Sequence, residues 1–163
     1  MPTAASESAE WVDLCLAIVK PWEGCEKRQG GMIVPYLDRL AKPPVWTRGY
    51  GRTYQISEDS PAISPDEAAA ELAQGLQAYG AKVAAMAPSL LSRPACMAAV
   101  TSWAWNCGTG AFKASRLRRA INDGRWDDAA ELIRKPNTAG GVVYRGLTRR
   151  REAERALFIR GIT

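Results

Sequence analysis

The chain has 163 residues, of which 47% are hydrophobic and 24% are charged, so its composition is that of a folded globular protein and argues against a disordered segment. No apolar run reaches the roughly 20 residues that span a bilayer, and the first ten residues lack the basic end and apolar block of a signal peptide. We therefore expect one domain over residues 1–163, without stable membrane insertion.

The four cysteines lack the close pairs of a zinc site, and the sequence has no histidine, which argues against a metal site and against a histidine-dependent triad. If Cys96 and Cys107 lie on one helix, about 1.5 Å per residue puts them roughly 16 Å apart, too far for a disulfide. A helix that continues past Cys15 weakens a bridge from Cys15 to Cys25 in the same way. We expect free buried thiols and no cofactor.

The net charge of +5 is unevenly distributed along the chain. Residues 113–163 contain 13 Lys and Arg against 6 Asp and Glu, a net of +7, which leaves −2 for residues 1–112. A basic half attracts a polyanion, such as nucleic acid, a membrane surface or an anionic cell wall, unless it is simply a solvated helix face. Because no nucleic-acid recognition motif is present, we do not expect a nucleic-acid partner.

Residues 8–22 have the three-and-four spacing of apolar side chains that is typical of an amphipathic helix. Pro21 and Gly24 favour an end to this helix near Glu23. The following segment contains Gly30, Gly31 and several prolines, which favour turns and short strands. We expect a small β-hairpin lobe at about residues 24–60.

The second half of the chain is predicted to be helical. Ser64, Pro65 and Glu67 form a good helix start, and that helix ends near Pro88. Residues 94–107 have almost no polar face, which indicates a buried central helix. Three further helices are expected, separated by breaks at Gly108 and Gly110, at Gly124 and at Pro136–Gly141, and they cover residues 115–122, 127–135 and 147–160.

Several motifs between about Trp22 and Phe158 occur in a recognisable order: Trp22-Glu23-Gly24, Tyr36-Leu37-Asp38, Trp46-Thr47-Arg48-Gly49-Tyr50-Gly51, Ala98–Gly108, Ala114–Leu117 and Gly146–Glu152. In this order they resemble the phage-type lysozymes, the endolysins of glycoside hydrolase family 24. The resemblance implies a mostly α (α+β) lysozyme-like fold. Its small β lobe would sit beside a larger helical part made of residues 1–23 and 61–163.

Cleavage of a glycosidic bond needs an acid for the leaving oxygen and a second group for the sugar carbon or a water. The resemblance implies that Glu23 is this acid, that Asp38 orients or activates a water, and that Thr47 helps to hold the water in an inverting reaction. Asp38 lies 15 residues after Glu23, and Thr47 lies nine after Asp38; both gaps are longer than in the family. The alternatives are a helix-end surface carboxylate at Glu23 and a merely solvated Glu26 or Asp38.

The resemblance also implies a sugar-binding surface and a support for the acid. Trp105, Asn106 and Ser115 match cleft positions of the family, and Arg149 matches an arginine that steadies the catalytic glutamate. For Trp105 the alternative is a core residue. For Arg149 the alternative is a solvated surface cation, like Arg150 and Arg151, which follow it. The residues expected in the core are Trp11, Trp103 and Trp126.

Arg48 and Arg52 stand where the family often has an aliphatic residue and a histidine. A cation near a general acid lowers its pKa, although the acid must stay protonated to act. These arginines therefore point away from Glu23, or the enzyme works at lower pH.

The implied function is hydrolysis of the β-1,4 bond between N-acetylmuramic acid and N-acetylglucosamine in peptidoglycan, by a monomeric phage or prophage endolysin. Such a protein would be made in the host cytoplasm and would reach the wall in the periplasm through a membrane lesion from a holin-type partner. The alternatives are an inactive cell-wall-binding or phage structural module and, from the basic half alone, a nucleic-acid binder.

Overall fold

In the computed structural model, residues 4–25, 27–136, 138–139 and 141–163 are described, with side chains from Glu10 onward apart from 138–139. The chain divides into two compact units. We call Val19–Gly75 the hairpin unit and Met1–Ile18 with Leu76–Thr163 the helical unit. Helix α1 (Ala4–Val19) ends at the boundary between them, and α2 (Pro65–Met86) crosses it.

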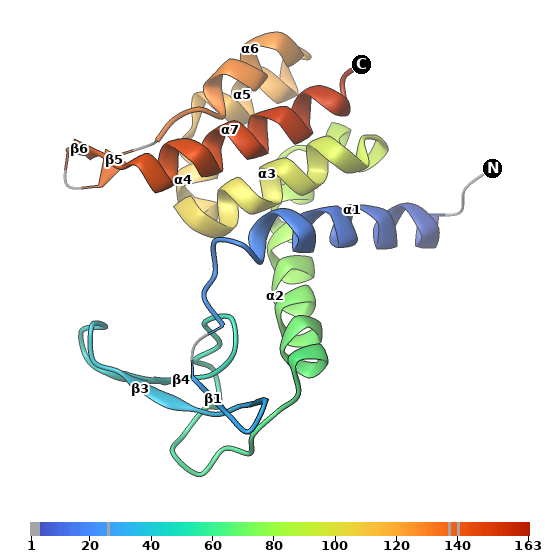
Figure 1. The fold of residues 1–163 in the computed structure, drawn as a ribbon. Coiled ribbons are helices and arrows are strands. Elements are labelled where there is room, and N and C mark those ends of the chain that lie inside the picture. The colour runs from blue at the N-terminus through green and yellow to red at the C-terminus, as the bar shows by residue number, and fades with distance from the viewer. Residues whose placement is uncertain (1–3, 26, 137, 140) are drawn as a thin grey trace. The chain divides into compact units, whose positions relative to one another are not determined.

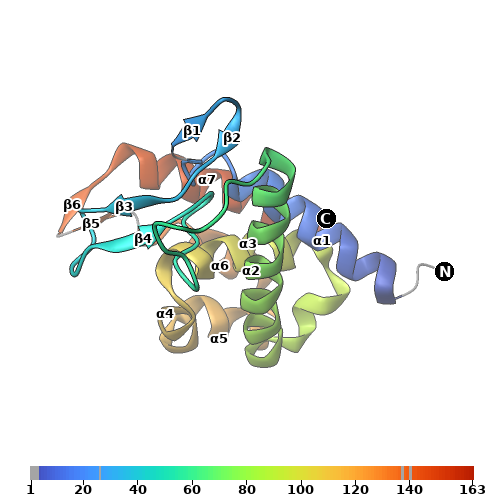
Figure 2. The same ribbon diagram turned by 90° about the horizontal axis from the view of Figure 1, so that it is seen from below.

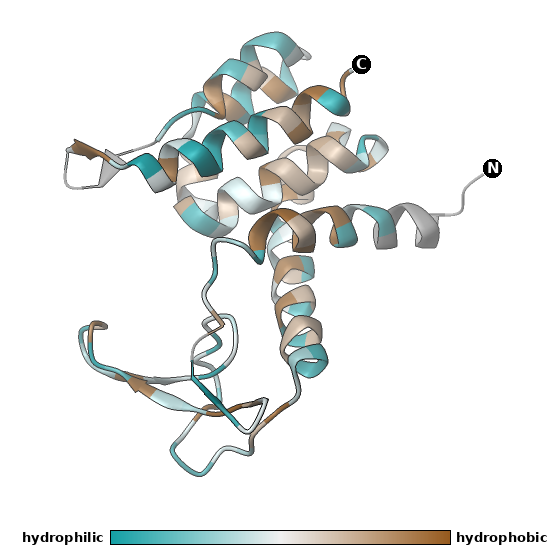
Figure 3. Cartoon of the chain, in the orientation of Figure 1, coloured by the Kyte–Doolittle hydropathy of each residue, from teal (hydrophilic) through white to brown (hydrophobic). Residues whose placement is uncertain are grey.

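The helical unit is built on α3 (Pro94–Cys107), which packs most extensively against α7 (Arg145–Arg160), as Figure 1 shows. Residues 96–104 of α3 are all buried, so the expected central helix is confirmed. Figure 3 shows α3 in pale shades over most of its length, whereas α7 carries several hydrophilic turns. The remaining helices of this unit are the 3-10 helix η1 (Pro88–Ser92), α4 (Thr109–Ala114), α5 (Arg116–Asn122) and α6 (Trp126–Leu132).

Two elements of this unit differ from the prediction. Helix α4 occupies a segment that Gly108 and Gly110 mark as a break. Gly108, at φ = +95°, ends α3 as predicted, but α4 begins at the next residue. Strands β5 (Thr138–Ala139) and β6 (Val142–Val143) form a short hairpin in the segment expected as a loop, of which residues 137 and 140 lie outside the described residues.

The predicted core tryptophans of this unit are buried to different degrees. Trp103 is 3% exposed, and its indole N–H donates to the Lys135 carbonyl at 2.8 Å. Trp11 is also buried, against Gly80, where an added Cβ would lie 2.2 Å from the ring. Both are therefore confirmed as core residues. Trp126 is only half-buried, with the Arg93 guanidinium 4.7 Å from its ring centroid.

Helix boundaries follow local chemistry closely. The Ser64 hydroxyl accepts from the Glu67 N–H, and the Glu67 carboxylate accepts from the Ser64 N–H at 2.7 Å, so the predicted capping box starts α2. Helix α1 ends at Val19, four residues before the predicted end near Glu23, because Pro21 has no N–H to continue the ladder. None of the described helices is both long and apolar enough to cross a bilayer.

The hairpin unit contains two separate antiparallel hairpins, visible in Figure 2. Strands β1 (Arg28–Gln29) and β2 (Met32–Ile33) are joined by Gly30 and Gly31, both at positive φ, as a two-residue type I′ turn requires. Strands β3 (Tyr36–Asp38) and β4 (Val45–Thr47) form the second hairpin. The mostly α fold with small β hairpins is thus confirmed.

Candidate active site

Glu23 lies in the hydrogen-bonded turn that follows α1. Its N–H donates to the Val19 carbonyl at 3.2 Å, and the Trp22 N–H donates to the same oxygen at 2.9 Å. The Glu23 side chain is half-buried. The carboxylate is therefore carried by a backbone that is tied to the last turn of a helix, as the sequence predicts.

Asp38 and Thr47 lie on one face of the β3–β4 hairpin. Asp38 pairs with Val45 and Tyr36 pairs with Thr47, so both site residues belong to the same set of alternate positions. Diagonal neighbours of this kind are typically about 7–8 Å apart, a separation that one water between two side-chain oxygens can bridge. The register thus brings together two of the predicted catalytic residues.

The Asp38 carboxylate is also held by the loop that follows it. Its Oδ1 accepts from the N–H of Leu40 at 2.9 Å and from the N–H of Ala41 at 3.4 Å. These bonds orient the half-buried side chain at the end of β3. Glu26, which the sequence analysis named with Asp38 as a carboxylate that is merely solvated, lies outside the described residues.

The residues that lengthen the gaps from Glu23 to Asp38 and from Asp38 to Thr47 form a hairpin and a loop of their own. Residues 29–34 build most of the β1–β2 hairpin, and residues 41–44 belong to the loop beyond the Asp38–Val45 pair. The first insertion precedes β3 and the second lies at the hairpin tip. Neither interrupts the ladder between Asp38 and Thr47.

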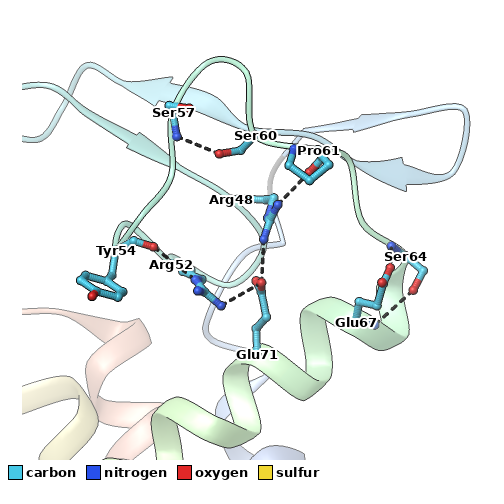
Figure 4. Close-up of polar contacts among 9 residues, drawn as sticks. All are labelled: Arg48, Arg52, Tyr54, Ser57, Ser60, Pro61, Ser64, Glu67 and Glu71. Carbon is cyan, nitrogen blue, oxygen red and sulfur yellow. Dashed lines mark hydrogen bonds and ion pairs between the residues drawn. The ribbon is translucent and has the colours of Figure 1, made fainter.

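Arg48 and Arg52 are neutralised in part by a shared acid on α2. Glu71 Oε1 accepts from Arg48 Nη2 at 2.6 Å and from Arg52 Nη1 at 2.9 Å (Figure 4). Arg48 Nη1 also donates to the Pro61 carbonyl at 2.7 Å. Both arginines are therefore paired with a carboxylate of α2.

The predicted sugar-binding residues belong to the helical unit. Trp105 is half-buried, and its ring meets Tyr79 edge-on at 4.8 Å between centroids. Asn106 is exposed, and its side-chain oxygen accepts from Arg151 Nη2. Ser115 caps α5: its hydroxyl accepts from the Arg118 N–H at 3.0 Å and donates to the Phe112 carbonyl at 2.7 Å.

Three consecutive arginines at the start of α7 have different environments. The Arg149 side chain is exposed, whereas Arg150 and Arg151 are 4% and 0% exposed. The expectation that Arg150 and Arg151 are solvated is therefore wrong. Both pair with Glu154, at 3.2 and 3.1 Å, because the i,i+4 and i,i+3 spacings on a helix bring the charges together.

Glu154 is a buried residue that the sequence reading missed. Burial raises the pKa of its carboxyl, although Arg151 and a hydrogen bond from Ser102 at 2.7 Å act to lower it. The helical spacing from Arg150 and Arg151 is the sequence signal that could have identified it. Arg151 links this buried acid to Asn106, and therefore connects the core of the helical unit to a predicted binding residue.

All four cysteines are free, as predicted; Cys15 and Cys96 are buried and Cys25 and Cys107 are half-buried. Burial raises the pKa of Cys15 to about 12 and that of Cys96 to about 11. Among the described residues, no group of three or more Cys, Asp or Glu side chains could hold a metal ion.

Residues 20–154 match the family model of phage lysozyme. A SAR-endolysin of Enterobacteria phage P21 is 30% identical over 147 residues, which cover 85% of this chain and 81% of that protein. An endolysin of Bacillus phage B103 is 48% identical over 63 residues, or 39% of this chain, and the matched part is only 24% of that endolysin's length.

Solved structures share the fold. The active form of P1 phage endolysin Lyz has a TM-score of 0.73 at 20% identity, covering 100% of this chain and 97% of that chain. The muramidase domain of SpmX from Asticaccaulis excentricus has a TM-score of 0.72 at 24% identity, covering 89% and 94%. At these identities the likeness concerns the fold, and it confirms the lysozyme-like architecture predicted above.

Proposed function

Because the chain belongs to the phage lysozyme family, we propose that it is an endolysin that acts as a muramidase, hydrolysing the β-1,4 bond between N-acetylmuramic acid and N-acetylglucosamine in peptidoglycan. The observation that carries this proposal is the β3–β4 register, which puts Asp38 and Thr47 on one face within the same unit as Glu23. The SAR-endolysin relatives over most of the chain support it.

Glu23 acts as the general acid. Protonation of the leaving oxygen requires a carboxyl group whose direction is fixed, because the proton must reach one oxygen of the substrate. The turn that ties the Glu23 N–H to the Val19 carbonyl supplies that fixed backbone.

Asp38 and Thr47 handle the attacking water. A carboxylate accepts the proton of the water, and the Thr47 hydroxyl helps to fix its oxygen on the far face of the sugar carbon. Direct attack by water inverts the anomeric configuration, whereas a covalent intermediate on Asp38 would retain it.

The substrate surface is assigned to the helical unit. Trp105 offers an aromatic face to a sugar ring, and Asn106 and Ser115 offer hydrogen bonds. The Ser115 hydroxyl already uses its proton on Phe112, so it can only accept from a ligand. The +7 charge of residues 113–163 supports attraction to an anionic wall.

The route to the wall is part of the proposal. We propose that the protein acts as a monomer in the periplasm, reaching it from the cytoplasm through a lesion made by a holin-type partner. Co-expression with and without a holin, followed by measurement of lysis time, tests this route independently of the catalytic assignment.

Replacement of the acid gives the main test. Wild-type protein should clear a suspension of outer-membrane-permeabilised bacteria, and Glu23→Gln should not, because the amide has no acidic proton. Glu58→Gln is a matched control, since Glu58 is an exposed carboxylate of the same unit. Binding to cell walls by wild-type protein without clearing would instead indicate an inactive wall-binding module.

The stereochemistry and Asp38 are tested together. NMR of the first product should show the α anomer, and a β-configured initial product would contradict a water-based mechanism. Asp38→Asn should remove most of the turnover while leaving the fold intact. Normal turnover of this variant would assign the second role to another group.

A further inference from the structure

We infer that Glu71 is a positioning residue for the reaction, acting through Arg48 and Arg52 to hold the turn that carries Thr47. This inference rests on the proposed function. Glu71 lies on α2, one turn after Glu67, and does not belong to any of the motifs that carry the family resemblance. Its contacts with the turn were not foreseen from the sequence.

The turn after β4 is closed by its own backbone. Arg48 and Arg52 exchange two backbone hydrogen bonds, of 2.9 and 3.0 Å, across the loop that Gly49, Tyr50 and Gly51 form. Gly49 and Gly51 have φ values of +62° and +88°, a region that side-chain-bearing residues rarely adopt. Thr47 immediately precedes this closed turn, so its position depends on where the turn is anchored.

Glu71 anchors the turn to α2. One carboxylate oxygen, Oε1, accepts hydrogen bonds from both arginines, as Figure 4 shows. Within the described part of the chain, the other oxygen of Glu71 has no hydrogen-bond partner. Both links between the arginines and α2 therefore pass through a single atom, and loss of that atom breaks both.

Burial distinguishes this cluster from an ordinary surface ion pair. The side chains of Arg48, Glu71 and Arg52 are 8%, 18% and 35% exposed. Exposed pairs are screened and contribute little, but an ion pair removed from water holds its geometry strongly, and breaking it leaves an uncompensated charge. Arg48 also donates to the Pro61 carbonyl, which gives the turn a second anchor in addition to Glu71.

Apolar contacts also lie beneath the turn. Gly49 faces Ala68 of α2, and Tyr50 packs against the cluster of Ile33, Ile63 and Ala68. Among the residues that the structure describes, the Thr47 hydroxyl makes one hydrogen bond, to the Val45 carbonyl at 3.3 Å, which is near the limit of hydrogen bonding. The hydrogen bonds from Arg48 and Arg52 to Glu71 add to this packing a directional link between α2 and the turn that follows Thr47.

The test compares two glutamates of one helix. Glu71→Ala should lower kcat at least tenfold and change KM less than twofold in reducing-end release from soluble peptidoglycan chains. Glu67→Ala removes the capping box of α2 but no contact with the turn, so its kcat should stay within twofold of wild type at a temperature where both variants are folded. Glu71→Gln keeps an oxygen acceptor and should recover part of the lost turnover.

Amide hydrogen exchange gives a readout that does not need activity. In Glu71→Ala, the amides of Arg48 and Arg52 should exchange at least tenfold faster, and in Glu67→Ala they should not. If Glu71→Ala does not fold, Arg52→Met replaces it, because Arg52 is partly exposed and its loss breaks one of the two links; its kcat should fall at least threefold. The inference is overturned if the measured variant, Glu71→Ala or Arg52→Met, keeps the wild-type kcat. It is also overturned if Glu67→Ala loses as much kcat as that variant. An inactive wild type would instead reject the proposed function, and the exchange rates would still decide the clamp.

Discussion

Arg151 donates a hydrogen bond to the side-chain oxygen of Asn106, and the same guanidinium lies 3.1 Å from the buried carboxylate of Glu154. The amide oxygen of Asn106 is therefore occupied, which leaves its NH₂ group as the part that can meet a ligand. The orientation of an exposed amide is thus set by a charge pair in the core of the helical unit.

Asn106→Asp should weaken substrate binding without loss of stability. The carboxylate keeps the partner Arg151 but replaces the NH₂ donor with an acceptor. One lost hydrogen bond of about 0.5–1.5 kcal/mol corresponds to a rise in KM of roughly twofold to thirteenfold. Asn122→Asp, an exposed asparagine on α5, controls for the added charge. An equal KM in both variants would remove Asn106 from the binding surface.

Glu154→Gln should destabilise the protein far more than Glu131→Gln. Each glutamate pairs with two arginines, but Glu154 is fully buried whereas Glu131 is exposed on α6. Removing the charge of Glu154 takes the paired carboxylate away from the fully buried Arg151, at a cost of about 3–5 kcal/mol. Urea denaturation of the two variants measures their free energies of unfolding. A small effect at Glu154 would mean that water enters this site.

Trp103→Ala should lower the free energy of unfolding by about 3–5 kcal/mol, as expected for a buried tryptophan. Its ring packs edge-on against Phe112, and its N–H bond to Lys135 would also be lost. Differential scanning calorimetry should show the lower melting temperature, while KM stays unchanged in the variant at a temperature where it is folded. An unchanged melting temperature would place the side chain outside the core.

The thiols of Cys15 and Cys96 should be unreactive toward a disulfide reagent at pH 8 and react fully after unfolding. Their pKa values rise from 9.0 to about 12 and about 11 on folding, because burial disfavours the thiolate. Since the folded pKa is raised, these groups contribute stability that is present below pH 9 and is lost as pH rises toward 11 and 12. Cys15→Ala should reduce this loss of stability at alkaline pH. Rapid reaction of the Cys15 thiol with the reagent in the folded protein would contradict the prediction.

Arg149→Ala should lower turnover if Arg149 steadies Glu23. A planar guanidinium holds a carboxyl group in one orientation, so its loss leaves the acid poorly placed. Arg149 is exposed, so the variant should fold normally. Arg116→Ala, another exposed arginine of the helical unit, is the control. Equal turnover in the two variants would leave Arg149 as surface charge.

The sequence alone determined the features that depend on neighbours within one turn or one strand. The capping box of Ser64 and Glu67, the end of α1 near Pro21 and the buried run of α3 are encoded by residues a few positions apart, whose interactions form wherever the segment lies. The ordered motifs identified the family for the same reason, since each is a short contiguous pattern.

Only the tertiary structure decided which distant charges meet. Register placed Asp38 and Thr47 on one face, and a shift of one residue would have turned one of them away. Arg48 and Arg52 reach Glu71 across 23 and 19 residues, and Arg151 reaches Asn106 across 45, separations at which composition carries no information about contact. Arg150 and Arg151 look like surface cations in the sequence, yet they are buried, because α3 and α7 pack together and enclose the carboxylate that pairs with them.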